Sequence, residues 1–210
     1  CSYKYPDPQW FKANQFDGID LDLENFTTKW VPNPGPNPGD NKTCAKELID
    51  YVNRFRQAFN NNCIVTSAPQ SPHFTGESSL NYADKDVWDI FDWLNIQYYN
   101  DFDGTTTCSQ NNKQWLLGIP VTLPGTHWGA VNLTYLTEKI DMPKSKIVVG
   151  KCGQGCSPKE QTYIGGQALK SWLAPLAYKG MMFWEWSSGT ITGQQWLTDS
   201  YSGSNATPCL

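Results

Sequence analysis

Residues 17–24, with the sequence DGIDLDLE, carry four carboxylates within eight positions. The alternation of acidic and apolar residues predicts a β-strand over residues 16–23. On such a strand Asp20, Asp22 and Glu24 project to one face, with about 6.6 Å between successive positions, and the apolar residues project to the other. Burial and mutual repulsion are then expected to raise the pKa of at least one carboxyl group, leaving a proton donor beside an ionised carboxylate. This pairing is typical of glycosidases.

Two other interpretations of the same segment remain open. The acids can be ordinary surface residues of an exposed edge strand. They can also form a site for a hard cation, because Asp-x-Asp-x-Glu supplies oxygen ligands. The outer carboxylates of an extended strand are about 13 Å apart, however, so an ion would need ligands from elsewhere. The two histidines, His73 and His127, lack zinc-type spacing and are expected to be structural, so we expect no metal and no cofactor.

The rest of the chain alternates strand-like and helix-like segments. Strands are expected at residues 63–67, 93–99, 146–150 and 180–185, and helices at residues 44–59, 133–140 and 167–177. Residues 31–41, rich in proline and glycine, are expected to form a loop, and the apolar run of residues 115–119 is left unassigned. Alternating strands and helices predict an α/β fold of parallel β/α units. With 210 residues, the chain is expected to form a single domain over residues 1–210.

The acidic segment resembles the signature of glycoside hydrolase family 18, the chitinases, and in particular the compact plant and fungal type to which hevamine belongs. That signature, Asp-Gly-x-Asp-x-Asp-x-Glu at the end of the fourth barrel strand, is matched at every fixed position. Residues 67–70 (SAPQ) and 97–100 (QYYN) are similar to the ends of the fifth and sixth strands, and residues 146–150 and 180–184 to the seventh and eighth.

The resemblance implies a (β/α)8 TIM barrel that is incomplete at its N-terminus, with strands four to eight present. A complete barrel takes about 250 residues, and the fourth-strand motif begins here near residue 16. The first three strands are therefore expected to be missing, and the N-terminal part of the barrel is an expected partner.

Roles for individual residues follow from the resemblance alone. Glu24 would be the general acid and then the general base, Asp22 would orient the N-acetyl group of the substrate, and Asp20 would share a proton with Asp22. Tyr99 would hydrogen-bond the same acetamide. The implied substrate-binding residues are Gln97, Trp184, Gln70 and Asn100. The reaction would be endo-hydrolysis of β-1,4 linkages in chitin with retention of configuration, in which the acetamide of the substrate acts as the nucleophile.

Two alternative functions use the same fold. One is a non-catalytic chitin-binding lectin or inhibitor, although such relatives usually lose the acid that Glu24 supplies. The other is an endo-β-N-acetylglucosaminidase that acts on N-glycans by the same acetamide-assisted chemistry.

Composition narrows the remaining possibilities. A net charge of −4 without a basic run argues against nucleic-acid binding, and no apolar run approaches the roughly 20 residues of a membrane span. Aromatic residues make up 14% of the chain, which suits stacking on sugar rings. Seven cysteines and the sequons at Asn25, Asn41, Asn132 and Asn205 indicate a secreted, disulfide-bonded glycoprotein. One thiol is left unpaired by the odd count, and a glycan on Asn25 is not expected because it would crowd the cleft beside Glu24.

Overall fold

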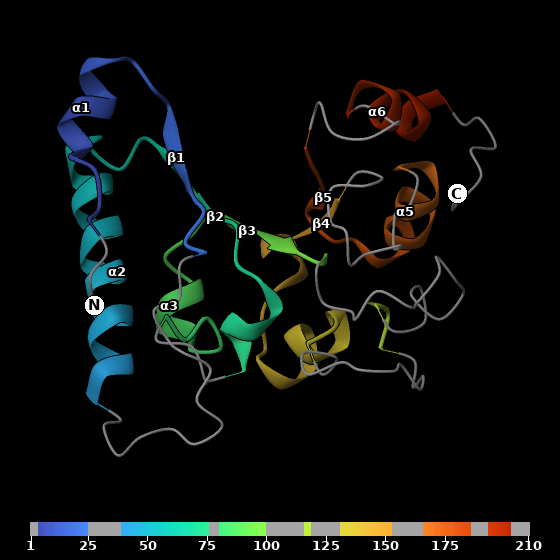
Figure 1. Ribbon diagram of the computed structural model, residues 1–210, viewed down its shortest axis with the longest axis horizontal. Helices are drawn as coiled ribbons and strands as arrows, with labels where there is room; N and C mark the ends of the chain where they lie inside the picture. Colours follow the sequence, from blue (N-terminus) through green and yellow to red (C-terminus); the bar gives the residue numbers. More distant parts are fainter. Residues whose placement is uncertain are drawn as a thin grey trace. The chain divides into compact units, whose positions relative to one another are not determined.

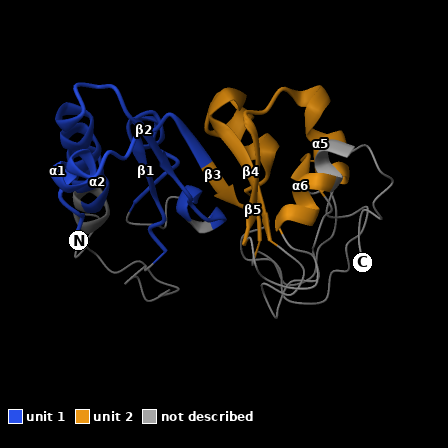
Figure 2. Ribbon diagram, turned by 90° about the horizontal axis from the view of Figure 1, so that it is seen from above, with its two compact units in different colours: residues 1–94 blue, residues 95–210 orange. Residues whose placement is uncertain are grey.

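The computed structural model describes residues 4–24, 39–75, 80–99, 116–118, 131–152, 166–185 and 193–202. The chain divides into two compact units, residues 1–94 and residues 95–210, which Figure 2 shows in different colours. The expectation of a single domain stays a prediction.

The first unit contains three helices, two strands and a 3-10 turn before the start of the third strand (Figure 1). They are α1 (Pro8–Ala13), β1 (Gly18–Leu21), α2 (Gly39–Ala58), β2 (Ile64–Ser67), η1 (Ser71–Phe74) and α3 (Lys85–Trp88). The division between the units falls within β3 (Trp93–Gln97).

The second unit continues from β3 through helical turns to two further strands and two helices. They are η2 (Tyr135–Lys139), η3 (Lys144–Lys146), β4 (Ile147–Cys152), α5 (Gly166–Leu173), η4 (Ala174–Leu176), β5 (Gly180–Trp184) and α6 (Gly193–Ser202).

The five strands follow the order β1-β2-β3-β4-β5 in one sheet. The pairs β1 with β2, β2 with β3, and β4 with β5 are parallel. Helices occur between successive strands, as parallel pairing requires. The expected α/β class with parallel strands is therefore confirmed.

Several expected boundaries are wrong in detail. The strand predicted over residues 16–23 is shorter at both ends, β3 ends at Gln97 rather than at residue 99, and β4 continues to Cys152. The helix predicted from residue 44 begins at Gly39, within the expected loop, because the prolines that forbid a helix end at Pro38. The helix predicted over residues 133–140 is largely the π-helical turn η2.

The core of the first unit forms around α2. Leu48, Tyr51, Val52 and Phe55 are buried along one side of this helix. Phe11 of α1 contacts Phe55 edge to face, with ring centroids 5.5 Å apart, and Figure 1 shows α1 beside the carboxyl-terminal end of α2.

Local sequence signals set the ends of these helices. At the start of α1, Asp7 accepts a hydrogen bond from the amide of Gln9 at 3.0 Å, and Pro8 occupies the first turn. After α2, Asn60 and Asn61 both adopt left-handed backbone angles, a conformation that asparagine tolerates at helix ends.

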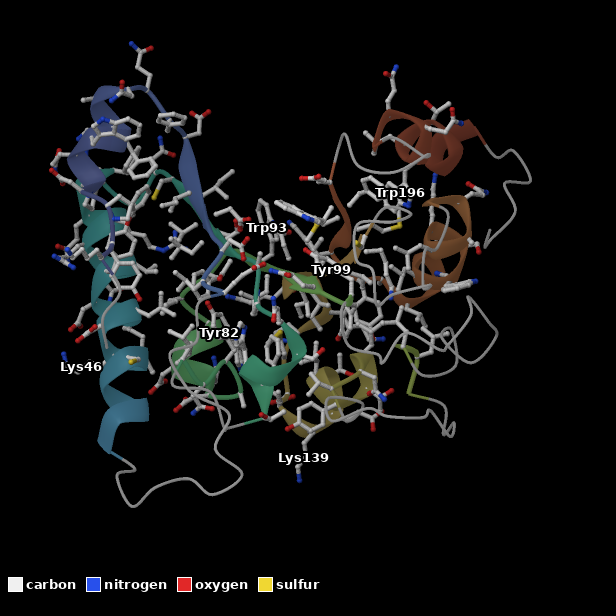
Figure 3. All side chains as sticks on the ribbon, in the orientation of Figure 1. Lys46, Tyr82, Trp93, Tyr99, Lys139 and Trp196 are labelled. Atoms are coloured by element: carbon white, nitrogen blue, oxygen red, sulfur yellow. The ribbon has the colours of Figure 1, made fainter. Side chains whose placement is uncertain are left out.

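The core of the second unit forms around β4, in which all six residues are buried. Phe183 of β5 stacks on Trp196 of α6 at a centroid distance of 5.0 Å, and Leu169 and Leu173 of α5 are also buried. Figure 3 labels Trp196 beneath α6. Within the described ranges, no helix is both long enough and apolar enough to cross a bilayer.

Candidate active site

The acidic segment lies at the carboxyl end of β1. Asp20 belongs to the strand, whereas Asp22 and Glu24 follow its last residue, Leu21. The expectation of three acids spaced along one strand face is therefore wrong, because pairing with β2 ends at the register pair Leu21 and Ser67. The carboxyl ends of parallel strands are where β/α folds carry their catalytic residues.

All three carboxylates are exposed to solvent in the first unit. The expected burial of this acidic row is therefore wrong, and exposure agrees with the alternative of surface acids at an edge strand. What distinguishes the segment from ordinary surface acids is the way in which β2 holds it.

Asp20 is held by a buried hydroxyl on the neighbouring strand. Thr66 is the register partner of Asp20, and its Oγ1 donates a hydrogen bond to Asp20 Oδ1 at 2.5 Å. Because the Thr66 side chain is buried, this hydrogen bond is shielded from competition with water more than a surface contact would be. The contact fixes one oxygen of a candidate catalytic carboxylate.

The backbone of β1 is fixed against β2 on both sides of Asp20. Gly18 lies so close to β2 that a Cβ atom at this position would be 1.9 Å from the Ile64 carbonyl oxygen. Beyond Asp20, the Leu21 carbonyl accepts hydrogen bonds from Ser67 Oγ at 2.6 Å and from the Ala68 amide at 3.0 Å. The acidic segment thus leaves the sheet from a rigid strand end.

Gln70 follows β2 and contacts a buried histidine. Its backbone amide donates to His73 Nδ1 at 2.8 Å, so this ring nitrogen acts as an acceptor. Burial lowers the pKa of His73 from 6.5 to about 3, which keeps the ring neutral near pH 7. His73 is therefore part of the core of the first unit, as its sequence context predicts. His127 lies outside the described residues.

Two candidate site residues of the second unit, one for binding and one for catalysis, lie at the end of β3. Gln97 is the last residue of the strand, Tyr99 comes two residues later, and both side chains are buried. The backbone between them leaves the regular ladder, because the Tyr98 amide donates both to the Ile96 carbonyl, two residues earlier, and to the Gly150 carbonyl of β4, each at 3.0 Å.

A lysine supports this irregular segment. Lys151 of β4 is fully buried, and its Nζ donates to the Tyr98 carbonyl oxygen at 2.6 Å. Asn100, another candidate binding residue, lies outside the described residues.

Trp184 ends β5 and is 47% exposed, so much of its indole is available to a ligand. Its register partner is Cys152 of β4, and the peptide bond to Glu185 is cis. Glu185 is exposed.

The candidate residues are thus divided between the two units. Asp20, Asp22 and Glu24 leave β1 in the first unit, where Gln70 also follows β2, and the second unit holds Gln97, Tyr99 and Trp184. Sequence reasoning missed Thr66 and Lys151. Thr66 could be found only from strand register, and Lys151 gave one signal, a charged residue two positions after the apolar run of residues 147–149.

Two cavities among the described residues are lined by residues other than those of the acidic segment. One, of about 690 Å³, is lined by polar side chains of α2 and by Tyr5. The other, of about 400 Å³, is lined by residues of α5, β5 and α6, including Met181 and Leu197. In the same described ranges, no three His, Cys, Asp or Glu side chains gather where they could hold a metal ion.

Comparisons with known proteins agree on the fold. No protein-family model matches the chain. Chitinase 2 of Rhizopus oligosporus is 27% identical over 186 residues, which cover 85% of this chain and 27% of that protein. The chain therefore spans about a quarter of the length of this curated relative.

Solved structures are similar over most of the chain. A GH18 chitinase from Pseudoalteromonas aurantia has a TM-score of 0.61 at 19% identity, over 93% of this chain and 64% of that one. Catalytic domain 2 of the Ostrinia furnacalis Group II chitinase has a TM-score of 0.57 at 13% identity, over 96% of this chain and 70% of that one. The chain therefore has a chitinase-like α/β fold with a parallel sheet of five strands.

Proposed function

We propose that the protein is a secreted endo-chitinase that hydrolyses β-1,4 linkages between N-acetylglucosamine residues. One observation carries the proposal: the sequence Asp20-x-Asp22-x-Glu24 leaves the carboxyl end of β1 with Asp20 held by Thr66, in a chain similar to chitinases. A related structure of the Ostrinia furnacalis domain contains a bound chito-oligosaccharide, which supports the same substrate class for this chain.

The proposed mechanism retains the anomeric configuration. Glu24 gives its proton to the glycosidic oxygen while the acetamido oxygen of the substrate attacks the anomeric carbon, so the glycosidic bond breaks and an oxazolinium ion forms. Glu24, now ionised, takes a proton from a water molecule. The water oxygen bonds to the anomeric carbon, and the bond from this carbon to the acetamido oxygen breaks, which opens the oxazolinium ring. Asp22, which shares a proton with Asp20, orients the acetamide and stabilises its positive charge, and Tyr99 hydrogen-bonds the same group.

The remaining candidate residues would bind the sugar chain. Trp184 offers an exposed indole face on which a pyranose ring can stack, and Gln97 offers a side-chain amide. Gln70 and Asn100 complete the proposed binding set.

The proposed architecture is a hevamine-like (β/α)8 barrel, of which this chain supplies strands four to eight of one catalytic domain. The coverage of 64% of the Pseudoalteromonas aurantia chain supports this interpretation. The N-terminal part of the barrel is then a partner. We also propose that the protein is glycosylated and contains disulfide bonds. Among the described cysteines Cys63 is a free thiol, which fits the odd number of cysteines in the chain.

The test is hydrolysis of N-acetylchitotetraose by the 210-residue chain and by its Glu24→Gln variant. Loss of the acid should lower kcat by about 10²- to 10⁴-fold. Glu138→Gln is the matched control, because Glu138 is an exposed glutamate of η2, and it should keep full activity. An active Glu24→Gln variant would contradict the assigned role.

The alternatives give different results in the same assay. Binding of the oligosaccharide without turnover would favour the lectin or inhibitor. Cleavage of a high-mannose glycoprotein but not of chitotetraose would favour the endo-β-N-acetylglucosaminidase. A chain that neither binds nor cleaves the oligosaccharide would overturn the proposal.

A further inference from the structure

Lys151 is an unusual residue for the centre of a sheet. Its exposed fraction is 0%, and β4 otherwise consists of Ile147, Val148, Val149, Gly150 and Cys152. Lysine is rarely buried unless its amine has a partner, since an amine removed from water without a hydrogen bond is costly. One partner of Nζ is the Tyr98 carbonyl oxygen, at 2.6 Å.

Strand register places Lys151 on the sheet face opposite Trp184. Lys151 pairs with Phe183, whose ring stacks on Trp196 of α6, so this face is covered by a helix. The residues on either side of Lys151 belong to the other face: Cys152 pairs with Trp184, and a Cβ on Gly150 would meet the Met182 side chain. A sugar stacked on Trp184 would therefore not touch Lys151, which excludes a direct role in binding.

The hydrogen bond acts at the point where β3 ends. Regular strand geometry stops at Gln97, and the Tyr98 amide turns back to the Ile96 carbonyl. The Tyr98 carbonyl carbon forms the peptide bond to the nitrogen of Tyr99. Lys151 Nζ thus holds the peptide group that leads into Tyr99, beyond the last residue of the strand.

We propose that Lys151 is a positioning residue for Tyr99: by binding the Tyr98 carbonyl from the helix-covered face, it fixes the backbone that aims the Tyr99 hydroxyl at the substrate. This inference rests on the proposed function, in which Tyr99 contacts the acetamide. A lysine that served only the packing of β4 would stabilise the unit without any specific connection to Tyr99.

The experiment is a double-mutant cycle on turnover of N-acetylchitotetraose by the 210-residue chain. Lys151→Met removes the amine and keeps a side chain of similar length, and it should lower kcat/KM about 10-fold, the worth of one buried hydrogen bond. In a Tyr99→Phe background the same substitution should have little further effect, because both changes act on one contact. Lys139→Met is the matched control, an exposed lysine of η2 that Figure 3 labels, and it should change nothing.

A second measurement does not depend on sugar. Hydrogen exchange of the amides of residues 97–99, followed by mass spectrometry or NMR, should be about 10-fold faster in Lys151→Met and unchanged in Lys139→Met. Lys151→Arg keeps a donor and should restore slow exchange. If Lys151→Met does not fold, Lys151→Leu, which also has no donor, replaces it with the same expectations.

The outcomes separate the two proposals. If the parent chain neither binds nor cleaves the oligosaccharide, the proposed function fails, and the exchange rates still decide whether Lys151 fixes this backbone. Unchanged exchange in Lys151→Met would overturn the inference whatever the activity. A loss of activity that multiplies with that of Tyr99→Phe would also overturn it, because it would show a general structural effect.

Discussion

At the residue scale, the feature that singles out the acidic segment is the Thr66 hydroxyl. Asp20, Asp22 and Glu24 are all exposed, so burial does not distinguish them from surface acids. The hydroxyl of Thr66 donates to one oxygen of Asp20 and thereby orients the carboxylate. In the proposed mechanism Asp20 shares a proton with Asp22, so a carboxylate held in one orientation is needed at this position.

Replacing Thr66 with valine tests this role. Valine has the same shape without the hydroxyl, so kcat on N-acetylchitotetraose should fall about 10-fold while KM stays nearly unchanged, because the lost contact acts on the acid pair rather than on sugar binding. Thr66→Ser keeps the hydroxyl and should retain most of the activity. Equal losses in the valine and serine variants would contradict an orienting role, because the serine variant keeps the hydroxyl.

The sequence could not predict Thr66 because its role depends on strand register. The motif of residues 17–24 and the later segments were visible one by one, and the five strands and their order along the chain were predicted correctly, whereas α1, α3 and α6 were not predicted. Which residue of residues 63–67 faces Asp20 depends on the pairing of Gly18 with Ile64, a contact between segments far apart in the chain. A shift of one residue would have placed a different side chain beside Asp20.

At the element scale, the close approach of β1 to β2 sets that register. Gly18 leaves no room for a side chain, because the Ile64 carbonyl carbon and oxygen occupy the position that a Cβ would take. These are backbone atoms, which cannot move aside without breaking the pairing of the two strands. A glycine is therefore required here by contact rather than by backbone angle.

Substitution of Gly18 by alanine should separate the two strands. The free energy of unfolding should fall by at least about 2 kcal/mol, measured by urea denaturation, because the added methyl group has no space. Gly180 of β5 offers the matched control, since no heavy atom lies within 4 Å of its Cβ position. Gly180→Ala should leave stability equal or slightly higher. A stable Gly18→Ala variant would show that β1 can shift away from β2, and the register above would then be wrong.

The ends of β1 and β4 could not be predicted from sequence patterns. Alternation of apolar and polar residues predicted that a strand exists near residues 16–23, yet the strand ends at Leu21, where pairing with Ser67 ends. The strand predicted over residues 146–150 continues to Cys152 and includes Lys151. Lys151 is buried and its amine binds the Tyr98 carbonyl just beyond the end of β3, a contact that no local pattern contains.

At the scale of the whole molecule, the stability of the fold is linked to pH through a buried ring. His73 is 1% exposed, accepts a hydrogen bond from the Gln70 amide, and stacks on Tyr82 at a centroid distance of 5.7 Å. Burial lowers its pKa from 6.5 to about 3. Protonation would place a charge in the core and remove the acceptor that Gln70 uses, so the folded state resists it.

This difference predicts the direction of acid destabilisation. Between pH 6.5 and about 3 the unfolded chain binds a proton at His73 that the folded chain does not, so stability falls as the pH falls, by up to about 1.4 kcal/mol per pH unit. From pH 7 to pH 5 the free energy of unfolding should fall by about 2 kcal/mol more in the parent chain than in His73→Asn, which keeps an acceptor and cannot titrate. His127→Asn, which changes the other histidine of the chain, should behave as the parent does. Parallel pH curves for the parent and His73→Asn would mean that the ring is protonated within the folded protein, and the neutral core histidine described above would then be wrong.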